Sequence, residues 1–94
     1  MRDDEFQWDD EKAAQNLDTH GISFEVARLA LDDAFAVERV DRRERYGQDR
    51  FILLGMVQGR LLAVAYSLRG ERVCIISARY AVSRERGRYH EENS

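Results

Sequence analysis

Two arginines are placed to face each other across a predicted β-hairpin. Runs of β-branched and aromatic residues flank Arg69-Gly70, and a two-residue loop with glycine second is typical of a hairpin. In that hairpin Arg60 lies directly opposite Arg79. Like charges at such a pair cost stability, on the order of a few tenths of a kcal/mol to ~1 kcal/mol. The two side chains therefore either turn to water or to carboxylates, or they form a site for an anion such as phosphate.

Two further side chains are candidates for moving protons. His20 ends a predicted helix just before Gly21, where the helix dipole favours the protonated imidazole. His20 is either a capping or packing residue, or a group that transfers protons and contacts phosphate. The chain also has Lys12, several arginines, tyrosines and carboxylates. Together with His20, these side chains suit metal-free chemistry on an anionic substrate.

Other kinds of site are not indicated. The chain has no phosphate-binding glycine motif, no GxSxG and no zinc-spaced set of cysteines and histidines. Asp32-Asp33 is an adjacent pair of carboxylates, but no matching ligand cluster accompanies it. We therefore expect neither a metal nor a cofactor.

The arginines are positioned by a predicted meander of three antiparallel strands within residues 51–78. Its first two-residue loop is Gln58-Gly59, which pairs Val57 with Arg60, and its second is Arg69-Gly70. Side chains alternate between the two faces of a strand, which puts Arg72 on the opposite face from Arg60 and Arg79. Both faces are largely apolar, so each needs cover from helices or from a second protein chain.

Helices and further strands complete the expected fold, which is one domain over residues 1–94. The expected N-caps are Asp9 for a helix to about Thr19, Ser23 for a helix to about Asp33, and Ser83 for a helix to about Glu92. Residues 5–8 and 35–40 are expected strands, and residues 41–48 an arginine-bearing polar loop that either contacts phosphate or is solvated. The order β-α-α-β-β-β-β-α predicts the α+β class, with an antiparallel sheet packed by helices.

Composition sets the broad class of protein. Residues 1–33 carry three basic and ten acidic side chains, whereas residues 34–94 carry twelve basic and eight acidic ones. The net charge of −3 is too low for charge alone to predict nucleic-acid binding. No apolar stretch approaches the ~20 residues of a membrane span, and the single cysteine, Cys74, is expected to be buried and reduced. We expect a cytoplasmic protein without membrane contact.

The order of short motifs resembles the BrnT family of toxins. That family opens with F-E-W-D, a Lys, an Asn, H-G and S-F-E, followed by D-D-P and E-R. The matching positions in this chain are Phe6, Trp8, Asp9, Lys12, Asn16, His20, Gly21, Ser23, Phe24, Glu25, Asp32, Asp33, Asp49, Arg50, Gly55, Gly59, Arg60, Leu61, Leu62, Val64, Tyr66, Gly70, Arg72, Ile75, Ile76, Ser77, Ala78, Arg79, Arg84, Glu85, Arg86 and Tyr89. The resemblance runs from about Phe6 to Glu91. Gln7, Ala34 and Tyr80 depart from it, because the family generally has Glu, Pro and Lys there.

The resemblance implies a RelE-like fold and a ribonuclease toxin of a type II toxin–antitoxin pair that arrests translation. It implies a BrnA-like ribbon-helix-helix antitoxin as partner, which neutralises the toxin and binds the operator DNA. A toxin dimer within a two-to-two complex would also cover both faces of the sheet. An interaction module that binds such a partner and cuts nothing is the competing hypothesis.

Metal-free RNA cleavage would give each candidate residue a role. Arg60 and Arg79, with Arg72, would hold the phosphate, and His20 or Lys12 would transfer protons. Trp8 or Tyr89 would stack on a base, and Arg84 would contact RNA. Trp8 and the sheet arginines would serve the protein interface instead if the chain were an interaction module.

Overall fold

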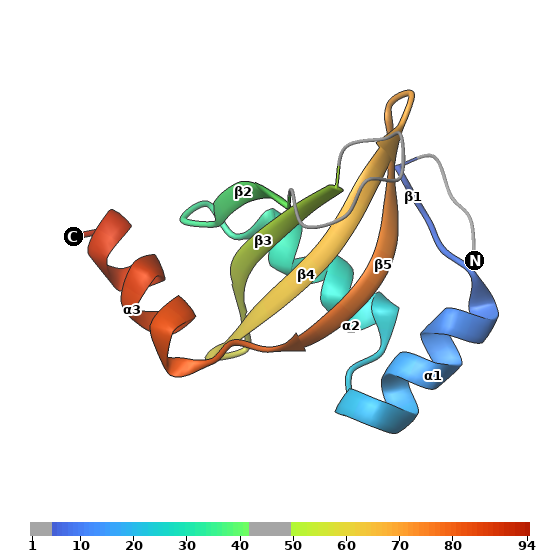
Figure 1. Ribbon diagram of the computed structural model, residues 1–94, viewed down its shortest axis with the longest axis horizontal. Coiled ribbons are helices and arrows are strands. Elements are labelled where there is room, and N and C mark those ends of the chain that lie inside the picture. The colour runs from blue at the N-terminus through green and yellow to red at the C-terminus, as the bar shows by residue number, and fades with distance from the viewer. Residues whose placement is uncertain (1–4, 42–49) are drawn as a thin grey trace.

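The computed structural model describes residues 5–41 and 50–94, and within them the chain forms a mixed five-stranded sheet with helices on both faces (Figure 1). The strands are β1 (Phe6–Gln7), β2 (Val37–Asp41), β3 (Arg50–Val57), β4 (Arg60–Arg69) and β5 (Arg72–Tyr80). The helices are α1 (Asp10–His20), α2 (Phe24–Ala27), the 3-10 helix η1 (Arg28–Asp32) and α3 (Ser83–Glu92). The spatial order is β1-β5-β4-β3-β2, and only β1 pairs in parallel. The predicted α+β class and element order are confirmed, while the arginines of the predicted polar loop lie outside the described residues.

The first hairpin has the predicted register. Val57 pairs with Arg60 across Gln58-Gly59. Both loop residues have positive φ, 51° and 79°, as a tight hairpin turn between twisted strands requires.

The second hairpin differs from the prediction, and the difference separates Arg60 from Arg79. The turn falls one residue later than expected, because Arg69 pairs with Arg72 around Gly70-Glu71. The register then shifts where Tyr66 faces Ile75 but Ala65 faces Ser77, which leaves Ile76 as an extra residue in β5. Such a β-bulge reverses the alternation of all later side chains.

Arg79 consequently lies opposite Ala63, and the predicted juxtaposition of Arg60 and Arg79 is wrong. Arg60 shares the sheet face of Val57, whereas Arg79 shares the opposite face. Because the bulge follows Arg72 in the chain, Arg72 and Arg79 lie on the same face, which is the reverse of the predicted arrangement.

The helices α1, α2 and η1 cover the face that carries Arg60. Phe24, Ala27 and Ala30 from α2 and η1 pack on strand residues such as Leu53 and Val64. The close approach of η1 to β3 depends on Gly55, since an added Cβ there would lie 2.3 Å from the Ala30 carbonyl oxygen. Asp9 and Ser23 cap α1 and α2 as predicted, with side-chain oxygens that accept backbone N–H bonds.

A buried asparagine fastens α1 to β5. The Asn16 amide donates to the carbonyl oxygens of Ile22 and Ala78, at 2.9 Å each, and its oxygen accepts a 3.0 Å bond from the Ala78 N–H. The side chain therefore pairs with β5 as a further strand would, beyond the end of the two-residue strand β1.

The opposite face of the sheet is covered by α3 alone among the described helices. Ile52, Leu54, Leu61 and Ala63 of the sheet form a second core with Tyr89. In Figure 1 α3 lies beside β2 and β3 at the end of the molecule away from α1. Much of this face beyond α3 is formed by the small residues Ala63, Ala65 and Ser77.

The helix α3 is capped differently from the prediction. Its first residue is Ser83, and the Ser83 side chain makes no capping bond to the helix N-terminus. The Glu85 carboxylate instead reaches back and accepts a 2.9 Å bond from the N–H of Val82, the residue before the helix. An acid at the third helical position does this in the capping-box arrangement.

Candidate functional site

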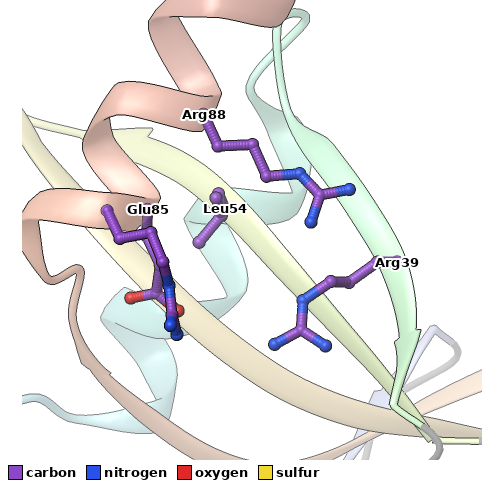
Figure 2. A pocket seen from close by; sticks show the side chains of 5 residues that line it. Arg39, Leu54, Glu85 and Arg88 are labelled. Atoms are coloured by element: carbon purple, nitrogen blue, oxygen red, sulfur yellow. The ribbon is translucent and has the colours of Figure 1, made fainter.

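Three arginines converge on a pocket between α3 and the edge of the sheet. The pocket has a volume of about 330 Å³ and is lined by Arg39, Leu54, Arg84, Glu85 and Arg88. Arg39 comes from β2, and Figure 2 shows its side chain extending towards α3 while Arg88 extends from α3 towards β2. Leu54, on β3, is part of the core under α3. We call this the arginine pocket.

The arginine pocket carries positive charge that its carboxylates do not fully compensate. Among the described residues no carboxylate lies within ion-pair distance of Arg39 or Arg84, and Arg88 has one exposed 3.5 Å contact to Glu92. Guanidinium groups stay charged at any physiological pH and match the geometry of phosphate oxygens. The pocket is therefore suited to bind a phosphate group.

Glu85 and Arg79 form a bidentate ion pair beside the pocket. Oε1 of Glu85 lies 2.7 Å from Nη1 of Arg79, and Oε2 lies 2.9 Å from Nη2. The hydrogen bonds from Arg79 lower the pKa of Glu85 more than its burial raises it, and Arg39 adds a further favourable charge. The side chain of Glu85 is 9% exposed and that of Arg79 is 38% exposed. Glu85 is therefore a charged carboxylate at neutral pH that orients Arg79.

A second, smaller hollow adjoins this ion pair on the same face. It has a volume of about 110 Å³, and Arg79 lines it together with Asp41, Arg50, Ile52, Ala63, Ala65 and Ser77. The short side chains of the central strands leave room there for a ligand to lie across the sheet. The Arg79–Glu85 pair thus stands between two hollows that arginines line.

The position of α3 is set by hydrogen bonds to the segment after η1. The Tyr89 hydroxyl donates a 2.6 Å bond to Asp33, and the Asn93 amide donates to the Phe35 carbonyl oxygen at 3.0 Å. Burial raises the pKa of Asp33, but bonds from Tyr89 and from the N–H groups of Met56 and Phe35 lower it overall. The bond to Asp33 in turn raises the pKa of Tyr89 to about 12.

The structure brings some of the predicted site residues together and separates others. Arg79 and Arg84 lie at or beside the arginine pocket, and Arg72 is on the same face of the sheet. Arg60 is on the other face, with its guanidinium 5.1 Å from the centre of the Tyr80 ring. Lys12 and His20 are exposed on α1, which packs against β5 and the core on the side of Arg60. Their proton-transfer role stays a prediction.

The two rings predicted to stack on bases are buried. Trp8 is 9% exposed and packs edge-on against Phe24, with ring centres 5.9 Å apart. Tyr89 is 6% exposed and its hydroxyl is bonded to Asp33. Both rings therefore pack in the interior of the described chain, and the stacking role stays a prediction that would require them to become exposed.

Arg39 and Arg88 line the pocket but are not among the site residues predicted from the sequence. Arg84 and Arg88 are four residues apart in a helix, a spacing that places both on one side of α3. That spacing in the sequence already indicates that Arg88 lies beside Arg84. Arg39 had no such indication, since its approach to α3 depends on β2 being the edge strand beside β3.

An apolar groove lies on the other face of the sheet. It has a volume of about 390 Å³ and is lined by Leu17, Gly21, Ile22, Ser23, Val26, Val57, Gln58, Arg60, Leu62 and Tyr80. Leu17, Val26 and Tyr80 are each exposed by 40% or more. Exposed apolar side chains that share one groove indicate a surface for a protein partner.

Neither a metal site nor a membrane span is evident in the described parts of the chain. No three His, Cys, Asp or Glu side chains gather as metal ligands within residues 5–41 and 50–94. In the same residues, no helix combines the length and the apolar character needed to cross a membrane.

Comparison with known proteins identifies the family. Residues 8–85 match the family model described as the ribonuclease toxin, BrnT, of type II toxin–antitoxin systems. No curated protein matches the chain. The match spans most of the 94 residues and includes β2, β5 and the first turn of α3, which carry Arg39, Arg79 and Glu85. The chain therefore belongs to the BrnT family of ribonuclease toxins of type II toxin–antitoxin systems, for which a protein antitoxin is the partner and RNA is the target.

Proposed function

We propose that this chain is a metal-independent endoribonuclease that binds RNA phosphates in the arginine pocket. The observation that carries the proposal is the convergence of Arg39, Arg84 and Arg88 from two elements, beside an Arg79 that a carboxylate holds in place. Three guanidinium groups from a strand and a helix suit an RNA backbone, in which each phosphodiester has two non-bridging oxygens that share one negative charge and accept hydrogen bonds.

The proposed reaction is an internal transfer of the phosphoryl group. The RNA 2′-oxygen attacks the adjacent phosphorus as its proton passes to a base, and the bond to the 5′-oxygen breaks as that oxygen gains a proton. The products are a 2′,3′-cyclic phosphate and a 5′-hydroxyl end. Charge builds up on the phosphorus oxygens in the transition state, and arginines fixed beforehand stabilise it without rearranging. Lys12 and His20, the proton-transfer residues predicted from the sequence, lie on α1 on the side of the sheet away from the arginine pocket, so cleavage in this pocket assigns the base and the acid to neither of them.

The chain is proposed to arrest translation by cutting RNA in the cytoplasm. We propose a BrnA-like ribbon-helix-helix protein as its antitoxin, in a two-to-two complex that binds operator DNA through the antitoxin. The apolar groove supports a protein partner on the face opposite the arginine pocket. Arg60 lines the groove and has no ion-pair partner among the described residues, so an apolar antitoxin segment with an acidic side chain fits it.

Growth and rescue test the partnership. Expression of the chain in bacteria is expected to arrest growth, and co-expression of a BrnA-like antitoxin is expected to restore it. The substitution Val26→Asp places a charge in the groove and should prevent rescue without preventing arrest. Rescue of that variant at the wild-type level would contradict the groove as the antitoxin surface.

Cleavage of a defined RNA tests the enzymatic proposal. The purified chain is incubated with the RNA in excess EDTA, with and without ribosomes, and the fragment ends are analysed. We expect fragments that end in 2′,3′-cyclic phosphate. Folded protein that yields no fragments in either condition would overturn the ribonuclease proposal and favour a non-catalytic binding module.

A further inference from the structure

Glu85 is a buried carboxylate within a cluster of arginines. It lines the arginine pocket with Arg84 and Arg88, and it is bonded to Arg79. A negative charge so close to a phosphate site weakens the attraction of the site for an anion. Its presence therefore requires a role other than binding phosphate.

The geometry around Glu85 indicates that role. Its two oxygens accept one hydrogen bond each from Nη1 and Nη2 of Arg79, which fixes the plane of the guanidinium group. Oε1 also accepts the Val82 N–H, which fixes the start of α3. One carboxylate thus ties the end of β5 to the helix that carries Arg84 and Arg88, while part of the Arg79 side chain stays exposed.

We propose that Glu85 is a positioning residue that holds Arg79 in the orientation in which it stabilises the reacting phosphate. This inference rests on the proposed function. A free arginine side chain samples many rotamers, and a cation stabilises a transition state best when it needs no rearrangement. Glu85 acts through Arg79 and does not itself contact RNA.

The substitution Glu85→Gln separates positioning from simple charge. Glutamine has the same shape and keeps an oxygen for the Val82 N–H. It loses the negative charge and the second acceptor for Arg79. If charge alone mattered, the variant would bind RNA more tightly and cleave it at least as fast. If Glu85 positions Arg79, the variant binds RNA as tightly as the wild type or more tightly, but cleaves it more slowly.

The experiment measures kcat and KM for a defined RNA, and Kd for the same sequence in a fully 2′-O-methylated form that cannot be cleaved. For Glu85→Gln we expect kcat to fall about 10- to 100-fold, with Kd unchanged or lower. This is less than the ~10²- to 10³-fold loss when a preorganised donor is removed outright, because Arg79 itself remains. Glu91→Gln is the matched control, since it removes an exposed carboxylate from the same helix. It should leave both constants near their wild-type values.

A double variant tests whether Glu85 acts through Arg79. In an Arg79→Lys background Glu85→Gln should have little further effect on kcat, because the bidentate pair is already lost. The same fold-loss in both backgrounds would overturn the inference. An unchanged kcat in the single variant would also overturn it. So would a weakening of RNA binding that matches a smaller folded fraction of the variant, measured by circular dichroism.

The wild-type reaction keeps the two claims distinct. Absence of cleavage by the wild type would contradict the proposed function, and this inference with it. Cleavage by the wild type and equally by Glu85→Gln would contradict this inference alone.

Discussion

The hydroxyl of Tyr89 donates a 2.6 Å hydrogen bond to the carboxylate of Asp33, which lies 56 positions earlier in the chain. The same carboxylate oxygen accepts the Met56 N–H at 2.8 Å. This contact joins α3, the segment after η1 and strand β3. The position of α3, which carries Arg84 and Arg88, therefore depends on a phenol–carboxylate bond in the C-terminal half of the helix.

Loss of that bond should weaken the docking of α3. Tyr89→Phe leaves the Asp33 carboxylate without its side-chain donor, and we expect a loss of about 1–3 kcal/mol in the free energy of unfolding. Urea denaturation followed by circular dichroism measures it. Tyr80→Phe removes an exposed hydroxyl and is the matched control, so equal losses in both variants would contradict the structural role of the Tyr89 bond.

Two glycines should respond in opposite ways to alanine. At Gly55 a Cβ would meet the Ala30 carbonyl oxygen at 2.3 Å, so η1 or β3 must move. We expect Gly55→Ala to destabilise the fold by about 1–3 kcal/mol, as overpacking does. Gly87, within α3, has open space around its Cβ position, and Gly87→Ala should stabilise the protein by up to about 1 kcal/mol. Thermal unfolding of both variants checks the pair, and a stabilising Gly55→Ala would refute the close approach.

Stability should depend on pH through the same contacts. The pKa values of Asp33 and Glu85 are lowered in the folded state, so their contribution is present above their ordinary values of 3.8 and 4.5 and is lost as pH falls below them. The pKa of Tyr89 is raised to about 12, so its contribution is present below pH 10 and is lost as pH rises from 10 to about 12. Unfolding free energies measured across pH check both limbs. If Tyr89→Phe lost as much unfolding free energy between pH 10 and about 12 as the wild type does, the assignment to Tyr89 would be contradicted.

The helices and strands could be predicted because the features that start and end them involve only neighbouring residues. Asp9 and Ser23 cap their helices through short-range bonds, and Gly59 permits the first hairpin, so each could be recognised from a few neighbouring residues. The element order and the fold class followed from these signals and from the apolar runs between them.

The candidate site was harder to predict because it depends on register and strand order. One extra residue in β5, Ile76, moved Arg79 to the opposite face from Arg60. Arg39 approaches α3 because β2 is the edge strand beside β3. Tyr89 is buried because α3 packs on the sheet, where its hydroxyl bonds to Asp33. A bulge and long-range contacts of this kind leave no clear pattern in a single sequence.

The central claim is that RNA is cut at the arginine pocket and not on the opposite face of the sheet. The most direct measurement compares kcat/KM for a defined RNA between the wild type, Arg39→Gln/Arg88→Gln and Arg60→Gln. The account predicts a fall of about 10²-fold or more for the double variant, because charge stabilisation at the phosphate is lost. It predicts a change within about twofold for Arg60→Gln, where only a screened charge on the far face is removed. Equal losses in both variants, or a loss confined to Arg60→Gln, would contradict the account.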